Sequence, residues 1–426
     1  MFRRQQFDAD YPRIIHEFET WVSQPVEPSR SLSDYFTEAL TRMGKAILES
    51  SYPAFMSAYF AGERIKKLAD KKSPEQLDWV DAICGGHEED MIVNMGLMLY
   101  DLAMLLPVEA FEDIEALTAQ LQQRELPEDF LNKWDEFIAR YGCRGPLEME
   151  LANPKYGEAP QLALQQMASI TNAGTTFNPH DMRATQVAQR EQAFEKLLSV
   201  LSPRKAKRLQ KDYATYLRYI ATRELFKHHI LQVYAQLRRM LLHRADTFIQ
   251  AGRLDQREQI FELTMADVET AVQDADFDLR ATAKQRSAFA HKLKSHVRHF
   301  PLFIDSRGRI LRAPPKYEAG ALVGVVVSSG VARGPVKVMH DPFEKEIQPG
   351  DVLVAVTTDP GWTPLFIPAA AVILEIGGEL QHGALVAREY GKPCVSSIQD
   401  VTNQFKDGQI VEVDGDAGVI RFIEED

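Results

Sequence analysis

The chain has 426 residues, of which 45% are hydrophobic and 26% charged, a composition typical of globular proteins and a length that suggests two or three domains. Its 49 lysines and arginines face 61 aspartates and glutamates, and the formal net charge of −12 disfavours a general role in binding nucleic acid or an anionic membrane. Three cysteines without a CxxC pair argue against a disulfide framework or a cysteine-based zinc site, and fit the reducing cytoplasm.

Residues 1 to about 300 have the periodicity of helices. Apolar residues recur every three or four positions, for example in DFLNKWDEFIARYG and REQAFEKLLSVL. The stretch 203–250 has no glycine and no proline after its first residue, and good helix formers dominate it, so we predict helix throughout. The most apolar run, 91–106, is too short for a membrane helix and contains Asn94 and Asp101, which predicts a buried helix instead.

Residues 320–426 change to a β pattern. Short runs rich in β-branched residues, such as DVLVAV and AAVILEI, alternate with glycine, proline and aspartate. This segment has 16 acidic and 7 basic residues, a net charge of −9, which leaves −3 for the rest of the chain. The prolines and glycine of RAPPKYEAG are typical of a linker. We therefore predict an α+β protein with a large, mostly helical domain at 1–312, a linker at 313–319 and a compact β/β/α domain at 320–426.

The most informative stretch is IGGELQHGALVAREYGKPCV, residues 376–395. A predicted strand ends at Gly377 and Gly378, and His382 follows four residues later, where a helical pattern begins. A histidine at a helix N-terminus lies beside backbone amides that have no partner within the helix, and at the positive end of the helix dipole. Such a place suits a phosphoryl group, and adjacent glycines let phosphate approach the backbone. The pattern predicts that His382 is a nucleophile that accepts phosphate and passes it on.

This stretch resembles the phosphohistidine swivelling domain shared by phosphoenolpyruvate synthase, pyruvate phosphate dikinase and rifampin phosphotransferase. The family motif has two glycines, three residues, the histidine, a small pair and an Ala-Arg-Glu-x-Gly-x-Pro run. The matching residues are Gly377, Gly378, His382, Gly383, Ala384, Ala387, Arg388, Glu389, Gly391 and Pro393. The stretches TTDPGWTPLF and YGCRGPLEMELANPKYGEAP resemble the rifampin phosphotransferase version, so the likeness extends into the helical part.

The resemblance implies a phosphotransferase of the dikinase type. ATP would give its βγ-pyrophosphoryl group to His382, release of inorganic phosphate would leave phosphohistidine, and the domain would swing to a helical acceptor site to phosphorylate a hydroxyl of a small molecule. The match at TRELFK implies that Arg223 and Lys227, four residues apart on one helix face, contact the phosphoryl group. A solvated basic face is the alternative.

The family motif also implies supporting roles for other residues. The expected phosphate-binding residues near the histidine are Gly377, Gly378 and Gly383. Arg388 and Glu389 would support the helix that carries the histidine.

In the helical part, Glu148 could orient Arg144 or act as a base for an acceptor hydroxyl, and a structural ion pair is the favoured alternative. Two residues depart from the pattern: Gln381 stands where a small hydroxylic residue or cysteine is usual, and Cys143 stands where histidine is frequent.

The partner implied by the family is a nucleotide-binding one. Members that act alone begin with an ATP-grasp-type domain, yet residues 1–300 have no glycine-rich phosphate loop and no GxxxxGK[ST]. We expect no cofactor or metal bound by this chain, with ATP and Mg²⁺ held by a separate ATP-grasp-type subunit. A non-catalytic scaffold homologue, or a truncated piece of a longer single-chain phosphotransferase, are the alternatives.

Overall fold

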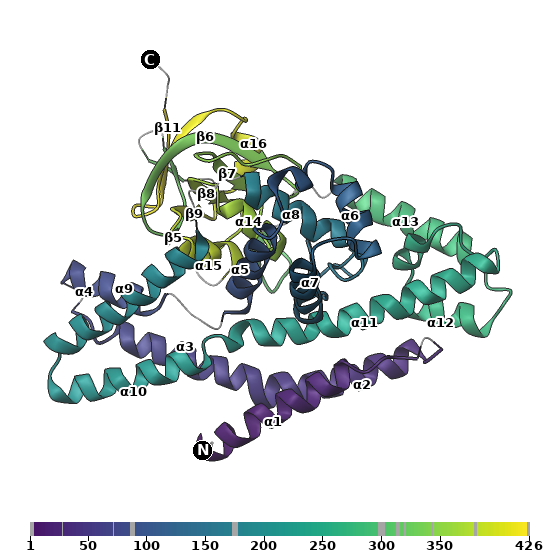
Figure 1. Ribbon diagram of the computed structural model, residues 1–426, viewed down its shortest axis with the longest axis horizontal. Helices are drawn as coiled ribbons and strands as arrows, with labels where there is room; N and C mark the ends of the chain where they lie inside the picture. The colour runs from purple at the N-terminus through teal and green to yellow at the C-terminus, as the bar shows by residue number, and fades with distance from the viewer. Residues whose placement is uncertain are drawn as a thin grey trace. The chain divides into compact units, whose positions relative to one another are not determined.

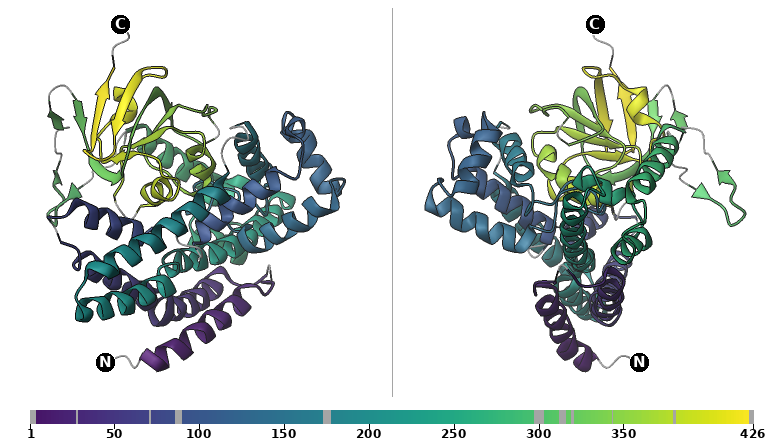
Figure 2. Two further views of the ribbon diagram at one scale, coloured as in Figure 1. Left: turned by 60° about the vertical axis from the view of Figure 1, so that its left-hand side comes forward. Right: turned by 90° about the vertical axis from the view of Figure 1, so that its right-hand side faces the viewer.

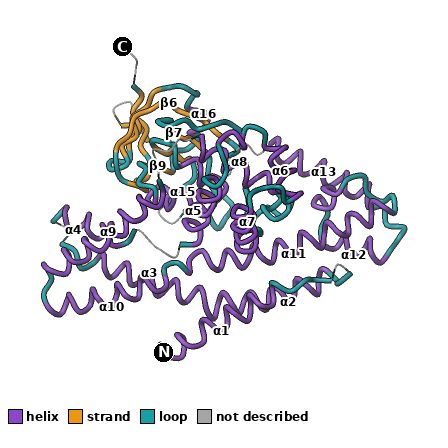
Figure 3. Tube along the Cα trace, in the orientation of Figure 1, coloured by secondary structure: helices purple, strands orange, loops and turns teal. Residues whose placement is uncertain are grey.

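The computed structural model describes residues 4–27, 29–70, 72–85, 90–172, 178–296, 303–311, 316–318, 321–342, 344–378 and 381–423. The chain divides into two compact units that interleave along the sequence. Unit 1 consists of Met1–Tyr59, Met149–Pro154 and Arg218–Phe300, and unit 2 consists of Phe60–Glu148, Lys155–Leu217 and Pro301–Asp426. Figure 1 labels the elements, and Figure 3 shows that strands are confined to the C-terminal part of the chain, which agrees with the predicted α+β class.

Unit 1 is helical, and its core lies along α11 (Thr222–Gln250). Val233, Leu237 and Leu241 of α11 recur every four residues, so they share one helix face, and that face is buried with Phe18 and Leu32. The remaining elements are α1 (Arg4–Val22), α2 (Leu32–Ala46), a π-helical turn (Ile47–Ser51), the first part of α3 (Tyr52–Lys66), a 3-10 turn (Arg257–Glu262), α12 (Met265–Gln273) and α13 (Leu279–His296).

Unit 2 combines helices with the main sheet. Asp90 caps α5, because its carboxylate accepts hydrogen bonds from the backbone N–H groups of Ile92 and Val93 at 2.9 and 3.2 Å. The longer helices are α4 (Pro74–Ile83), α5 (Met91–Ala103), α6 (Ile114–Gln123), α7 (Glu128–Tyr141), α8 (Pro160–Asn172), α9 (Pro179–Val200) and most of α10 (Pro203–Tyr219). The short ones are α14 (Thr363–Phe366), α15 (His382–Glu389) and α16 (Val401–Gln404), with 3-10 turns at Val108–Phe111 and Pro360–Trp362.

Within the described residues, nine strands form the main sheet, in the order β3-β4-β11-β10-β6-β7-β8-β9-β5, and β1 (Phe303–Ile304) pairs with β2 (Ile310–Leu311) in a separate hairpin. Figure 2 shows the strands gathered into one curved sheet. The run β6-β7-β8-β9 is parallel and the other pairs are antiparallel. The main-sheet strands are β3 (Lys316–Glu318), β4 (Ala321–Val323), β5 (Val325–Ser328), β6 (Val331–Met339), β7 (Val352–Ala355), β8 (Ala371–Leu374), β9 (Cys394–Ser396), β10 (Ile410–Asp414) and β11 (Val419–Phe422).

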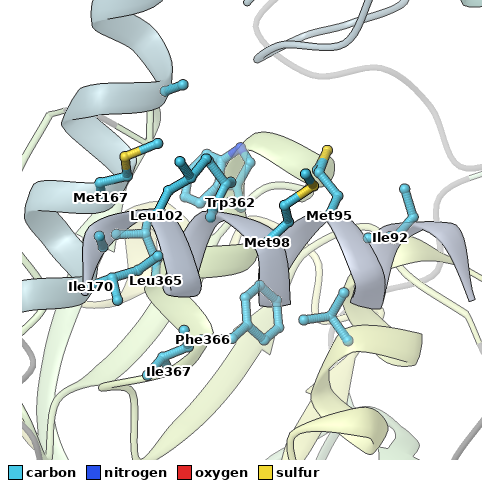
Figure 4. Packing of buried hydrophobic residues seen from close by; sticks show 14 of the residues in the cluster. Ile92, Met95, Met98, Leu102, Met167, Ile170, Trp362, Leu365, Phe366 and Ile367 are labelled. Carbon is cyan, nitrogen blue, oxygen red and sulfur yellow. The ribbon is translucent and has the colours of Figure 1, made fainter. Parts of the chain in front are cut away.

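The sheet and the helices of unit 2 share one apolar core. Met95, Met98 and Leu102 of α5 lie against Trp362 and the residues of α14 that follow it (Figure 4). The same cluster contains side chains of α7, α8 and α15 and one face of β7 and β8. Every residue of β7 and β8 is buried, which explains their uninterrupted apolar sequences, because a parallel strand covered on both faces has no polar side.

The apolar run 91–106 forms the buried helix α5, as predicted, and none of the described helices is long and apolar enough to cross a membrane. The stretch 203–250 is two helices and not one, because the chain turns at Ile220 and Ala221, where the Thr222 hydroxyl bonds to the Tyr219 carbonyl.

Part of the predicted linker forms a strand in the structure. Lys316–Glu318 within the expected linker is strand β3, paired with β4, while its other residues lie outside the described ranges. The two compact units are discontinuous in sequence, and helices between residues 60 and 217 share their core with the sheet. The division into domains at 1–312 and 320–426 stays a prediction.

Unit 1 contains a buried histidine. His229 of α11 is fully buried, its ring centroid lies 4.5 Å from that of Phe18, and neither ring nitrogen has a hydrogen-bond partner among the described residues. Burial disfavours the charged imidazolium and lowers the pKa of His229 to about 4 from its usual 6.5.

We predict that His229 causes a loss of stability between pH 6.5 and pH 4. The unfolded chain takes up the proton near pH 6.5 and the folded unit only near pH 4, so stability is complete above this window and falls within it. The expected loss from pH 7 to pH 5 is about 2 kcal/mol. Urea unfolding at both pH values should show that His229→Leu removes this loss, whereas His243→Gln, at an exposed position of the same helix, keeps it.

Candidate active site

His382 is the first residue of α15, as the sequence pattern predicted, and its side chain is half-buried. The helix follows β8, so its N-terminus lies at the carboxyl end of a parallel strand. This edge of an open parallel sheet is where ligands bind in α/β proteins, and the first helical amides and the helix dipole favour an anion there. The arrangement suits a histidine that carries a phosphoryl group.

A threonine hydroxyl 19 residues earlier in the sequence contacts the histidine. Thr363 Oγ1 of α14 lies 3.3 Å from His382 Nε2, and the Thr363 side chain is almost fully buried. Gln381, the unusual residue before the histidine, forms no side-chain cap on α15, and its Oε1 lies close to Gly377. Thr363 was missed as a site residue, although its stretch, TTDPGWTPLF, follows the strand that pairs in parallel with β8.

The three glycines assigned to phosphate have different surroundings. A Cβ at Gly377 would lie 2.6 Å from Ser396 Cβ, and a Cβ at Gly383 would collide with Thr358 Oγ1 and Leu374 Cδ1. Only Gly378 has open space at that position. Close packing therefore explains glycine at 377 and 383, while phosphate contact at all three stays a prediction.

Two buried hydroxyls flank this loop without a partner. Thr358 and Ser396 are 7% and 0% exposed, and their hydroxyl oxygens have no hydrogen-bond partner among the described residues. Thr358 follows β7 and contacts the first turn of α15, while Ser396 ends β9 beneath Gly377. A buried hydroxyl without a partner costs about 1–3 kcal/mol, so each needs an explanation.

Hydrogen bonds tie the turn before Thr363 to the helices of unit 2. The Leu147 backbone N–H donates to Asp359 Oδ2 at 2.6 Å, and Gln166 Nε2 of α8 donates to the Gly361 carbonyl at 2.8 Å. Gln166 is itself held by the Tyr156 hydroxyl at 2.9 Å. These bonds fix the turn that positions Thr363, and hence the contact that Thr363 makes with His382.

The side chains of Arg144 and Glu148 are buried. The two side chains are 0% and 1% exposed and form an ion pair at 3.3 Å, and Lys155 Nζ donates to the Glu148 carbonyl at 2.9 Å. The Glu148 carboxylate is almost completely enclosed, so an acceptor hydroxyl could not reach it from solvent. Its burial favours a structural ion pair over a role as catalytic base. Burial raises the pKa of the neighbouring Cys143 thiol to about 11, so this residue is neutral at physiological pH.

The other predicted residues occupy the ends of helices. Arg223 and Lys227 lie half-buried in the first turns of α11 in unit 1, and Arg223 is 3.6 Å from Glu224. Arg388 and Glu389 lie at the C-terminal end of α15, away from His382 along the helix, where Arg388 Nε bonds to the Ala384 carbonyl. Their predicted roles in phosphate binding and support stay predictions.

Comparison with known proteins supports the resemblance. Residues 347–418 match the family model of the PEP-utilising enzyme mobile domain, and residues 47–224 match that of the rifampicin phosphotransferase fourth domain. The rifampicin phosphotransferase of Bacillus cereus is 26% identical over 409 residues, covering 92% of this chain and 46% of that protein. Those of Streptomyces sviceus and Bacillus subtilis are each 30% identical, covering 68% and 67% of this chain and 34% of each relative.

The relation to rifampicin phosphotransferases predicted from the sequence is therefore confirmed. This chain spans less than half the length of each of these three relatives.

We predict that the buried ion pair stabilises unit 2 only when both partners are present. Glu148→Leu should lower the free energy of unfolding by about 3–5 kcal/mol, because Arg144 would keep a buried charge without its carboxylate. Adding Arg144→Met should recover most of that loss. Asp135→Asn, which breaks an exposed pair with Arg124, should cost less than about 1 kcal/mol in the same denaturant titration. A double variant as unstable as Glu148→Leu would contradict this explanation.

Proposed function

We propose, from the relation of this chain to the rifampicin phosphotransferases, that it is a phosphotransferase component that carries phosphate on His382. The phosphate comes from ATP bound on a partner domain or subunit of the ATP-grasp type and goes to a hydroxyl of a small molecule. The observation that carries the proposal is the placement of His382, half-exposed as the first residue of α15 at the carboxyl edge of the parallel strands.

The chemistry proposed is that of a dikinase. A ring nitrogen of His382 attacks the β-phosphorus of ATP and displaces AMP, which leaves a pyrophosphoryl group on the histidine. Water then cleaves the bond to the γ-phosphorus and releases inorganic phosphate. The remaining phosphoryl group passes to the acceptor hydroxyl, whose proton is lost as the imidazole is restored. Mg²⁺ on the partner would neutralise charge on the phosphates of ATP.

The residues of this chain have separate tasks in the scheme. The N-terminal amides of α15 stabilise charge on the phosphoryl group, and the Thr363 hydroxyl holds the imidazole. Arg223 and Lys227 are proposed to steady the group during transfer to the acceptor, because two cations on one helix face can bind several phosphoryl oxygens.

We predict that Mg-ATP labels His382 only when an ATP-binding partner is present. Intact-mass spectrometry at alkaline pH, where phosphohistidine survives, should show a mass gain with Mg-ATP plus a separately expressed ATP-grasp candidate. His382→Ala should abolish the gain, and His340→Ala, at an exposed histidine of the same sheet region, should retain it. Labelling that persists in His382→Ala would refute the nucleophile, and no labelling with a competent partner would favour the scaffold alternative.

We predict that Arg223 and Lys227 act on transfer and not on labelling. Arg223→Gln and Lys227→Gln should leave the mass gain on His382 intact, and should each slow phosphate transfer to a low-molecular-mass cell extract by about ten- to a hundredfold, which corresponds to losing one or two charge-assisted bonds. Arg239→Gln, at an exposed position of the same helix, is the matched control. Transfer rates equal to those of the unaltered protein would identify Arg223 and Lys227 as an ordinary basic face.

A further inference from the structure

We propose that Thr358 and Thr363 form a pair of hydroxyls that positions His382 and then binds the phosphoryl group on its ring. Thr363 holds the unmodified imidazole, and Thr358 finds its hydrogen-bond partner only when the phosphoryl group is present. This inference rests on the proposed function, since it concerns how the same histidine is held during its cycle.

Thr363 is fixed in a way that aims its hydroxyl at the ring. Its side chain is 2% exposed, and its methyl carbon lies 3.5 Å from the position of a Cβ on Gly96 of α5. With the methyl group packed on α5, the hydroxyl lies 3.3 Å from His382 Nε2. A threonine hydroxyl both donates and accepts, so it can bond to that nitrogen with or without a proton.

Thr358 lies in the loop after β7, and its side chain lies close to the N-terminal end of α15. It follows β7, the parallel neighbour of β8, and its hydroxyl would collide with a side chain at Gly383, the second residue of α15. The side chain is 7% exposed, and its oxygen has no hydrogen-bond partner within the described part of the chain. For comparison, the buried Thr402 hydroxyl lies 3.4 Å from Glu375 Oε2.

A phosphoryl group at the N-terminal end of α15 would supply a hydrogen-bond acceptor for the Thr358 hydroxyl. Phosphoryl oxygens are strong acceptors, and a hydroxyl that donates to an anion forms a short, charge-assisted bond. The desolvation cost of the buried oxygen is then balanced in the phosphorylated state and not in the resting state. Thr358 therefore favours phosphohistidine over the unmodified ring, and Thr363 orients the ring in both states.

The test uses phosphoramidate, which transfers its phosphoryl group to a histidine nitrogen and releases ammonia, so no partner subunit is required. Thr358→Val and Thr363→Val replace each hydroxyl with a methyl group of similar size. Thr357→Val, at the exposed position beside Thr358, is the matched control. The ring ¹⁵N shifts of His382 report the contact with Thr363, and intact mass over time reports the half-life of phosphohistidine.

We expect each buried variant to shorten the half-life of phospho-His382 by about three- to tenfold, the effect of one lost hydrogen bond. Only Thr363→Val should shift the ring ¹⁵N signals of the unmodified histidine, and Thr357→Val should change neither measurement. Thr358→Ser and Thr363→Ser retain the hydroxyls, so they should resemble the unaltered protein even if a valine variant folds poorly.

Two outcomes would overturn the proposal. Half-lives that are unchanged in both valine variants, with native circular dichroism, would show that the hydroxyls do not contact the phosphoryl group. If the serine variants shorten the half-life of phospho-His382 as much as the valine variants do, packing of the threonine methyl groups, and not hydrogen bonding, stabilises phosphohistidine. Failure of phosphoramidate to label His382 in the unaltered protein would instead refute the proposed function itself, and the ¹⁵N shifts would still decide whether Thr363 holds the ring.

Discussion

The double-sided burial of β7 and β8 is the constraint on which the candidate site depends. Both strands are apolar along their whole length, so both faces of the sheet must be covered. One face packs with α14 and α15 against α5, α7 and α8, and the other forms a second cluster with residues such as Val401, Val411 and Ile420. Because α14 carries Thr363 and α15 begins with His382, the burial that stabilises the sheet also brings these two side chains together.

Hydrogen bonds and a buried ion pair hold the segments that apolar burial brings together. The bonds from Leu147 to Asp359 and from Gln166 to Gly361 hold the turn before α14, and the Arg144–Glu148 pair stiffens the segment from which Leu147 projects. Buried polar networks of this kind contribute specificity when all members have partners. The helices of unit 2 therefore support the segment that leads to His382, in addition to sharing an apolar core with the sheet.

The sequence was most informative where local pattern and local structure coincide. The glycine pair, the start of a helix at His382 and the buried run at 91–106 follow from spacing and capping rules, and all three appear in the structure. Thr363 and Thr358 could not be assigned this way, because their importance arises from strands that are adjacent in the sheet and distant in sequence. The turn at Ile220 was missed because it depends on one side-chain bond to the backbone at Thr222. The shared core of sheet and helices depends on tertiary packing, which periodicity does not specify.

Any movement of His382 under the proposed function has to accommodate the interleaving of the two units along the sequence. A domain joined to the rest of a protein by one flexible linker can rotate freely. Here the backbone passes between the two units at five places. Two of those passages, Tyr59–Phe60 and Leu217–Arg218, lie within the helices α3 and α10. If instead the sheet alone left α5 and α8, Trp362 and Met95 would become hydrated, with a rise in heat capacity that calorimetry records. Under the proposed function, carrying phosphate would therefore require exchanging this buried apolar face for another, and a subunit that receives His382 would need a complementary apolar face.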